Sequence, residues 1–439
     1  MKKILVIMSF WMIAACAKRF HPEQALTKLD FEPITVTTIH QNSGSLGPCE
    51  PSICINPLNK KHIVAGSVLD NLYVSNDCGI NWKVQKMKSS HGVYGDPVVR
   101  MTKDGKPLFA HLANSKGKAY SSPEFLDRIV VQRSEDGGTS WNDGSFPKVD
   151  HTKDHDKQWM SVGPDGTVLM TWTEFDKYGS DKPEHKSRIL FSKSKDGGLT
   201  WDNAKVISSF EGDCLDGDLT TEGAYPVIGS DGTYHVVWTY DNKIWFNSSR
   251  DEGKTWLKEE KSIADQPGGW SFEIPGIGRA NGMPVMVCDH SKGPNKGTLY
   301  VSWSDQRHGV DDTDVWMISS KDQGKTWTQP ARVNNDPGGR HQFFSWMDID
   351  QHTGYLYFVF YDRRNYSDNQ TDVFLAYTLN SGKTFENVQI SQIPFTPEAT
   401  LFFGDYNDIS CSGNSIRPIW TRQDDKTLSV QTAIINVKK

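Results

Sequence analysis

Several carboxylates stand just before short apolar segments, where they could take part in acid–base chemistry. The set consists of Glu50, Asp96, Asp156, Glu222 and Asp405. If the segments begin around one axis, these side chains converge and repel one another, which raises some of their pKa values. A carboxyl group with a raised pKa suits a general acid. A cation site and simple exposure to solvent are the alternatives.

Arginine residues supply the second group of candidates. Asp305 and Arg307 recur one repeat later as Asp362 and Arg364. A pair that repeats in this way favours an ion pair that clamps a loop over a catalytic role.

Residues that break the repeat are better candidates for ligand contacts. Glu174, Tyr240 and Arg422 each take the place that Asp305 has in its own repeat. Arg279 lies between Gly278 and Gly282, where small residues let the backbone approach a ligand.

Metal chemistry has weaker support. Residues 212–218 form an acidic loop whose oxygen ligands would suit Ca²⁺, although their spacing differs from that of helix-loop-helix sensors and a solvated loop is the alternative. No C-x-x-C occurs, so the cysteines support neither a zinc site nor a thioredoxin motif. We assign no metal ligand from the sequence.

An internal repeat must position these side chains. The pattern Ser-x-Asp-x-Gly-x-Thr-Trp, with Asn or Ser in place of Thr in the first two copies, ends at residues that are 55 to 71 positions apart. The copies start at Ser75, Ser134, Ser194, Ser249 and Ser320, with a divergent copy at Thr378. The aspartate can accept hydrogen bonds from the following turn, and glycine supplies a positive φ. The motif therefore stabilises a hairpin and is not a catalytic device.

The segments between the repeats alternate as β-strands, and none shows a sustained helical period. Radial repetition of four-stranded sheets predicts an all-β fold, a single β-propeller. Seven inner strands are expected, beginning near Pro51, Pro97, Trp159, Pro226, Pro284, Ser345 and Tyr406. The last unit lacks a fourth strand, which Glu32–His40 could supply. We therefore favour seven blades over six.

The repeated turn resembles the Asp-box, or bacterial neuraminidase repeat, of the sialidase-like β-propeller superfamily. That resemblance implies three arginines that grip a substrate carboxylate, a tyrosine nucleophile assisted by a glutamate, and a separate aspartic acid. Matching residues would be Arg279, Arg364 and Arg422, then Tyr406 or Tyr240 with Glu222, and Asp96. The Arg-Ile-Pro signature of the family is absent, and sialidase catalytic domains have six blades.

Two functions follow as expectations. A sialidase-like, exo-acting glycoside hydrolase on acidic surface glycans requires arginines and carboxylates in one axial pocket, with an aromatic wall from Trp270 or Tyr406. A non-catalytic propeller that binds glycan or protein in the cell envelope requires dispersed arginines paired with aspartates. The net charge of −6 excludes a basic field for nucleic acid. We expect a monomer with a carbohydrate ligand.

The first residues indicate export. Lys2 and Lys3 precede an apolar stretch and the small residues Ala14 and Ala15, as in a secretory signal. The sequence that ends at Cys16 resembles a bacterial lipobox, which implies lipidation of Cys16 and attachment to a membrane. The expected organisation is a signal peptide over 1–15, a linker over 16–30 and the propeller over 31–439. Ala17 is not acidic, which by resemblance favours the outer membrane or cell surface.

Overall fold

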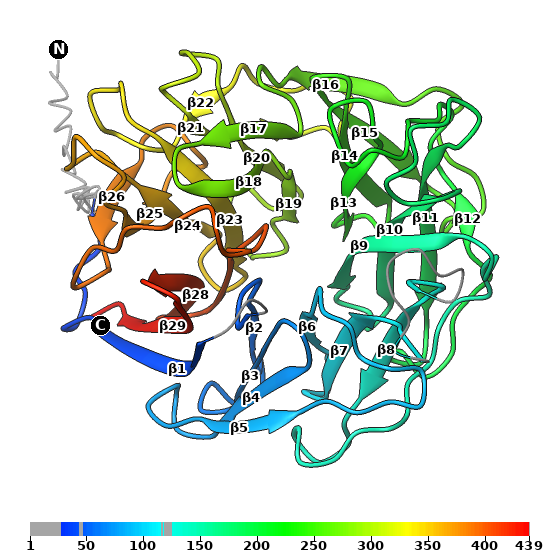
Figure 1. Cartoon of the computed structure of the whole chain (residues 1–439), viewed down its shortest axis with the longest axis horizontal. Helices are drawn as coiled ribbons and strands as arrows, with labels where there is room; N and C mark the ends of the chain where they lie inside the picture. The colour runs from blue at the N-terminus through cyan, green and yellow to red at the C-terminus, as the bar shows by residue number, and fades with distance from the viewer. Residues whose placement is uncertain (1–27, 44–46, 116, 118–124, 439) are drawn as a thin grey trace, which may run out of the picture.

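A computed structural model describes residues 28–43, 47–115, 117 and 125–438. The expected signal peptide and Cys16 lie outside these residues. The described chain is all-β, a propeller of seven antiparallel sheets around one axis (Figure 1). Six sheets have four strands, and the sheet β6-β7-β8 has three, with Ser145 bridged to Val131 at its outer edge. None of the described residues forms a helix that is long and apolar enough to cross a membrane.

We number the blades in chain order. Blades 1 to 3 comprise β2 to β5 (Ser52–Ile55, Ile63–Ser67, Asn71–Ser75, Lys83–Lys86), β6 to β8 (Val98–Met101, Pro107–Leu112, Ile129–Arg133) and β9 to β12 (Asp154–Val162, Val168–Phe175, Ser187–Ser194, Lys205–Val206). Blades 4 and 5 comprise β13 to β16 (Glu222–Ile228, Tyr234–Tyr240, Lys243–Ser249, Lys261–Asp265) and β19 to β22 (Val285–Cys288, Leu299–Asp305, Asp314–Ser320, Ala331–Arg332). Blades 6 and 7 comprise β23 to β26 (Gln342–Asp350, Tyr355–Asp362, Asp372–Thr378, Glu386–Gln389) and β27 to β29 (Asp408–Ser412, Ser415–Asp424, Thr427–Asn436) with β1 (Thr35–Ser43). The seven inner strands confirm the predicted blade count.

Blade 7 is completed by the first strand of the chain, as expected. β1 pairs antiparallel with β29, so that Thr35 lies opposite Ile434 and Ser43 opposite Thr427. The two ends of the described chain therefore meet in one sheet, and the ring has no open seam.

Large aromatic side chains fill the spaces between blades. Trp172, Trp238, Trp303 and Trp420 occupy the second strands of four blades, and all are fully buried. Their recurrence explains why the second strand of each unit carries an aromatic residue in the sequence.

The repeated turns link third and fourth strands. In blade 5, Ser320 donates to Asp322 (2.8 Å), and Asp322 accepts from the backbone N–H of Thr326 (2.9 Å). Gly324 has a φ of +77°, and a Cβ there would overlap the ring of Phe246 in blade 4. Because strands alternate in direction, these turns lie on the face where inner strands end.

One element was not expected. The hairpin of β17 (Ser271–Ile274) and β18 (Ile277–Asn281) follows blade 4 in the chain and lies over blade 5, on the face where inner strands begin, with β18 in contact with β23 of blade 6 (Figure 1). It carries Arg279, which the sequence analysis placed just before an inner strand.

Candidate functional site

Charged residues with a left-handed backbone mark the entrances to three neighbouring inner strands. Glu50, Asp96 and Lys157 have φ values of 52°, 47° and 54°. Residues other than glycine adopt this conformation at a cost, and such positions concentrate at functional sites. The side chains of Asp96 and Lys157 meet near the axis, with 3.5 Å between Oδ2 and Nζ.

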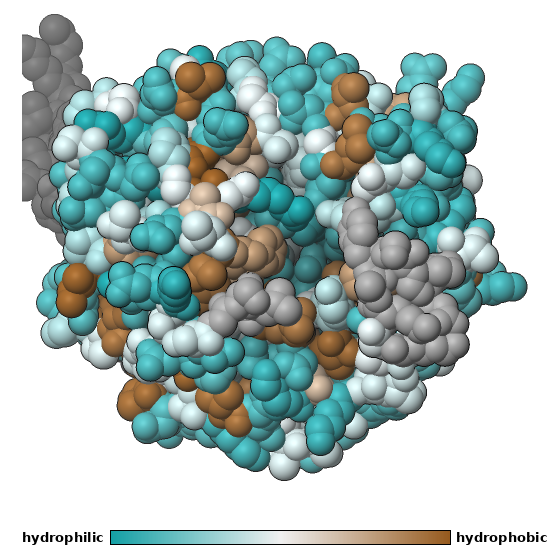
Figure 2. All heavy atoms as spheres, viewed as in Figure 1, coloured by the Kyte–Doolittle hydropathy of each residue, from teal (hydrophilic) through white to brown (hydrophobic). Residues whose placement is uncertain are grey.

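An ion cluster occupies this end of the axis. The carboxylate of Asp405 lies 2.6 Å from Nζ of Lys157 and 2.9 Å from Nε of Arg279. Nη1 of Arg279 is 2.6 Å from Asp216. Figure 2 shows a hollow near the middle of this face, with hydrophilic residues inside it and both hydrophilic and hydrophobic residues at its rim. We call the following residues the axial cluster: Glu50, Asp96, Asp156, Lys157, Tyr178, Asp216, Glu222, Arg279 and Asp405.

Burial separates the acids of the axial cluster into two kinds. Burial raises the pKa of Asp156 to about 8, and repulsion from Asp96 adds to the effect. Burial also raises the pKa values of Glu50 and Glu222 well above their ordinary range. For Asp405, burial acts in the same direction, but Arg279 and Lys157 outweigh it and hold the pKa below its ordinary value. At neutral pH the hollow therefore holds both protonated and ionised carboxyl groups.

Tyr178 and Asp216 form a hydrogen-bonded pair in the axial cluster. The hydroxyl of Tyr178 donates to Oδ2 of Asp216 (2.6 Å), and the indole of Trp270 donates to Oδ1 (3.1 Å). Sequence reasoning missed Tyr178, and it considered Asp216 only as part of an acidic loop. Both residues lie in segments outside the strands, where the repeat gives no register.

Glu222, the predicted partner of the tyrosine nucleophile, belongs to the axial cluster, as does the predicted acid Asp96. Glu222 is fully buried and accepts a hydrogen bond from Thr173 (3.3 Å) through Oε2. Its Oε1 has no hydrogen-bond partner among the described residues.

The proposed nucleophile Tyr406 forms the floor of the hollow instead of a reactive group. Its hydroxyl donates to the carbonyl of Pro97 (3.3 Å), and its ring packs against Trp159, with 5.0 Å between centroids. Burial raises its pKa well above the usual range, as it also does for Tyr178, so the pKa does not distinguish the two phenols.

The other predicted arginines each have an aspartate of their own. Arg307 pairs with Asp305 (Nε–Oδ1 2.9 Å), Arg364 with Asp362 (2.8 Å), and Arg422 with Asp424 (2.6 Å). The first two guanidinium groups also cover aromatic rings, 4.2 Å from the Trp316 centroid and 4.3 Å from that of Phe374. These three arginines share no partner with Arg279. The predicted arginines are therefore dispersed, and each is paired with its own aspartate.

Glu174 and Tyr240 also lie outside the axial cluster. Glu174 forms an ion pair with Lys153 (3.0 Å). The ring of Tyr240 stacks on Phe210 with 4.6 Å between centroids. Both residues are engaged in contacts within the blades.

The acidic loop at 212–218 does not gather its carboxylates at one point. Asp213 accepts from Thr220 (2.5 Å), and Asp218 accepts from the backbone of Ser271 (2.9 Å). Asp216 instead joins the axial cluster. Calcium binding by this loop stays a prediction.

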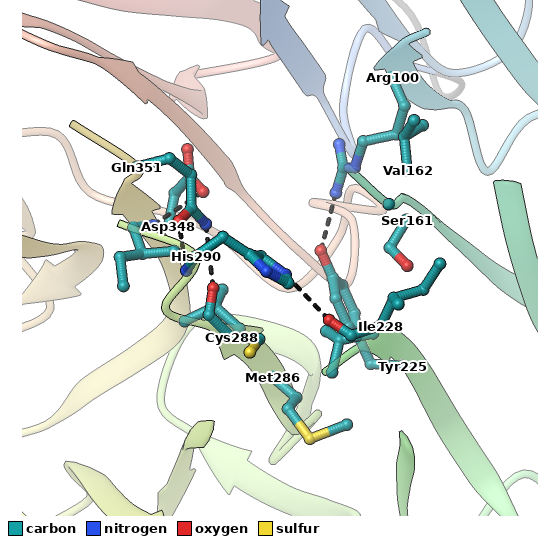
Figure 3. A pocket seen from close by; sticks show the side chains of 14 residues that line it. Arg100, Ser161, Val162, Tyr225, Ile228, Met286, Cys288, His290, Asp348 and Gln351 are labelled. Carbon is teal, nitrogen blue, oxygen red and sulfur yellow. Dashed lines mark hydrogen bonds between the residues drawn. The ribbon is translucent and has the colours of Figure 1, made fainter. Parts of the chain in front are cut away.

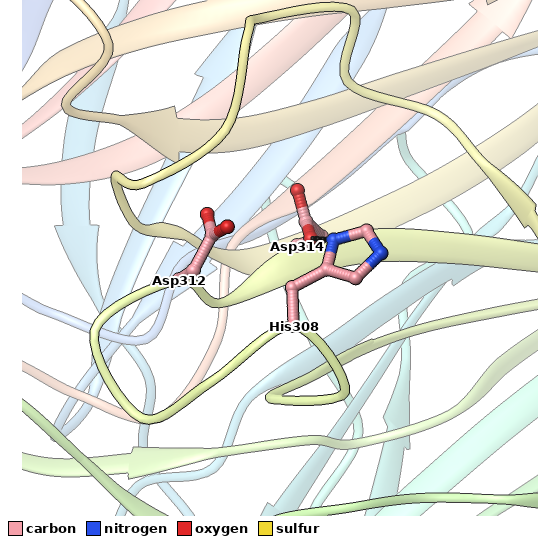
Figure 4. Close-up of side chains that lie close together, drawn as sticks. All are labelled: His308, Asp312 and Asp314. Atoms are coloured by element: carbon pink, nitrogen blue, oxygen red, sulfur yellow. Dashed lines mark hydrogen bonds and ion pairs between the residues drawn. The ribbon is translucent and has the colours of Figure 1, made fainter.

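A second group with metal-ligand chemistry lies in blade 5. Ligand atoms of His308, Asp312 and Asp314 lie within 4.8 Å of one another (Figure 4). His308 already donates to Asp314 (2.7 Å), and the guanidinium of Arg332 lies 3.3 Å from the other oxygen. In blade 6 the equivalent Asp372 accepts a hydrogen bond from Tyr366 (2.9 Å). The contact between a loop side chain and the first aspartate of the third strand therefore recurs there without a histidine. A neighbouring cation and this recurrence favour a structural role.

The protein is similar in fold to several known structures. No protein-family model and no curated protein matches the sequence. A protein of unknown function from Dyadobacter fermentans aligns with a TM-score of 0.50 at 14% identity, over 92% of this chain and 99% of its own. A polysaccharide lyase of family PL25, an ulvan lyase, aligns with a TM-score of 0.52 at 10% identity, over 89% and 95%. The sialidase NanB from Streptococcus pneumoniae aligns with a TM-score of 0.49 at 10% identity, over 86% of this chain and 83% of its own. At these identities the similarity shows the propeller fold alone.

Proposed function

We propose that this protein is a glycan-acting hydrolase, sialidase-like and exo-acting, whose chemistry takes place in the axial hollow. The observation that carries the proposal is the 2.6 Å hydrogen bond from Tyr178 to Asp216, beside Arg279. Asp156, with a pKa of about 8, supplies a protonated carboxyl group in the same cluster. A nucleophile with its base and a separate acid are the groups that retaining glycoside hydrolysis needs.

The steps follow from these positions. The oxygen of Tyr178 attacks the anomeric carbon and passes its proton to Asp216, while Asp156 donates its proton to the leaving glycosidic oxygen. The glycosidic bond breaks and a glycosyl–tyrosine bond forms. Water then attacks the same carbon and gives a proton to Asp156, the glycosyl–tyrosine bond breaks, and the oxygen of Tyr178 leaves with the proton that Asp216 returns.

The substrate class is proposed from the charges in the hollow. Lys157 and Arg279 are its cations, and protonation of Asp156, Glu50 and Glu222 reduces its negative charge, so an acidic sugar could enter. Lipidation at Cys16 would hold the enzyme at the cell surface, close to such glycans. The grip by three arginines that sialidases use is not built here, so neutral sugars belong in the same assay.

The proposal is tested with a panel of fluorogenic acidic and neutral glycosides. Tyr178→Phe and Asp156→Asn should each lower kcat by about 100-fold or more, because each removes a group that transfers a proton or forms a bond. Tyr240→Phe is the matched control and should retain full activity. Turnover that is unchanged in Tyr178→Phe would exclude this mechanism.

A second candidate is a propeller that binds glycan without cleaving it. The pairing of Arg307, Arg364 and Arg422 with aspartates favours it, because a binding propeller was expected to show that arrangement. Saturable binding of a glycan without turnover of any glycoside in the panel would establish it.

A further inference from the structure

A layer of aromatic rings divides the axis of the propeller into two halves. Trp159 contacts Trp346 with 4.3 Å between ring centroids, and Tyr225 stacks on Trp159 at 5.7 Å. Tyr406 closes the layer on the side of the axial cluster. Whatever binds below these rings is separated from the hollow described above.

Below the rings lies a second chamber, at the end of the axis where inner strands finish (Figure 3). Its volume is about 160 Å³, whereas a single water needs only about 10–15 Å³ on the same measure. Val162, Ile228 and Met286 provide apolar walls, while Arg100 and Asp348 provide charge. An apolar cavity with a few fixed polar groups is the usual form of a small-molecule site.

Arg100 is held rigidly in this chamber. Its Nη1 donates to Asp408 (3.1 Å) and to the carbonyl of Val99 (2.7 Å), and its Nε donates to the carbonyl of Met160 (3.2 Å). One N–H of Nη2 reaches the hydroxyl of Tyr225 (3.0 Å). A guanidinium has five N–H groups, so among the described contacts one N–H of Nη2 is left for a ligand.

Two further polar groups line the same space. Oγ of Ser161 is buried and has no hydrogen-bond partner among the described residues, which costs free energy unless a ligand or water supplies one. Asp348 accepts from the backbone of Ile349 and of Cys411 (2.8 Å each), and its carboxylate keeps further lone pairs. The chamber therefore offers both donors and acceptors.

The charges decide which ligand fits. A carboxylate in the chamber would approach Asp348, and an amine would approach Arg100, so each ion meets a like charge. A hydroxyl group both donates and accepts, and it carries no charge. We propose that this chamber is a second binding site, for a neutral monosaccharide unit, on the face opposite the axial cluster.

Saturation-transfer NMR on the full-length protein tests the site, with glucose and galactose as neutral probes and glucuronate and glucosamine as charged ones. A neutral sugar should bind with a dissociation constant on the order of 1 mM. Both charged sugars should bind at least fivefold more weakly. The monosaccharide unit can be a free sugar or the end of a glycan, and the methyl glycoside of the same sugar distinguishes the two. Binding equal to that of the free sugar indicates the end of a glycan, and weaker binding indicates a free sugar.

Variants locate the binding. Ser161→Ala should weaken it about fivefold through the loss of one hydrogen bond. Val287→Phe should abolish it by filling the chamber. Tyr178→Phe, which removes the proposed nucleophile above the aromatic layer, should leave it unchanged, so this site and the proposed hydrolase can fail separately.

Three results would overturn the proposal. The first is that neither neutral sugar shows saturable transfer at a sugar concentration about ten times the expected dissociation constant. The second is that binding is unchanged in both Ser161→Ala and Val287→Phe. The third is that binding is lost in Tyr178→Phe.

Discussion

At the scale of single residues, the axial cluster separates side chains that look equivalent in the sequence. Asp156 and Asp405 both stand at the entrance of an inner strand, yet the pKa of the first is raised to about 8 and that of the second is lowered. The difference arises because Arg279 and Lys157 both contact Asp405. Proximity to cations, which is set by the fold, therefore decides which carboxyl group can act as an acid.

The raised pKa of Asp156 predicts how stability and activity depend on pH. An unfolded chain would ionise Asp156 near 3.8, whereas the folded protein keeps it protonated to about 8. Its contribution to the free energy of unfolding is thus complete below pH 4 and is lost as pH rises through about 8. Denaturant unfolding between pH 5 and 9 should show this loss, and Asp156→Asn should make it smaller, leaving the part that Glu50 and Glu222 contribute. Catalytic activity should fall over the same alkaline range.

Asp181→Asn, at an exposed position, is the control for the pH experiment and should keep the wild-type dependence. An identical decline in Asp156→Asn and wild type would assign the effect to another group.

Arg364 is expected to stabilise the fold without contributing to chemistry. Arg364→Ala leaves the fully buried Asp362 without its partner, so the free energy of unfolding should fall by about 3 kcal/mol. Turnover per folded molecule should stay unchanged. Urea unfolding and glycoside assays measure the two effects, with Arg340→Ala, an exposed neighbour, as control. A loss of turnover without a loss of stability would place Arg364 in the site.

At the scale of elements, the strands and turns that repeat from blade to blade were predicted from the sequence, and the hairpin and loops that do not repeat were missed. The six turns and the alternating strands located the seven inner strands, because every copy repeats the same spacing. Among the described residues, the hairpin β17-β18 has no counterpart in the other blades, and the loops that carry Tyr178 and Asp216 differ in length from the equivalent loops, so no register could place them. The sequence predicted that the carboxylates at the starts of the inner strands converge, but it did not predict the pair of Tyr178 and Asp216.

The repeated turn should act only on stability. Asp322 accepts hydrogen bonds from Ser320, from the backbone of Lys325 and from Thr326, and Asp322→Ala removes them together. We expect a loss of about 1–2 kcal/mol in thermal or urea unfolding. Activity should persist, because the turn lies on the face away from the axial cluster. Lys325→Ala, which leaves those bonds in place, should unfold like wild type, and a matching loss there would contradict the assignment.

At the scale of the whole molecule, we expect the closure of blade 7 to make the propeller unfold as one cooperative unit. A chain shortened by removal of residues 1–43 lacks β1, so the edge of β29 is left unpaired. Such a chain should lose the sharp unfolding transition in circular dichroism and should aggregate. A chain that starts at Lys28 keeps β1 and should unfold as a single step. Equal transitions for both chains would show that β1 is dispensable.

The pairing of β1 with β29 also sets the order in which the ring can be assembled. Six blades consist of consecutive strands and can form while synthesis is still under way, but the seventh needs residues from both ends. Until Asn436 has emerged, β1 has no partner strand and its backbone groups must stay hydrated or be shielded by another protein. The ring is therefore expected to close only after β29 has been made, so that β1, the earliest of the described strands, is the last of them to find its partner.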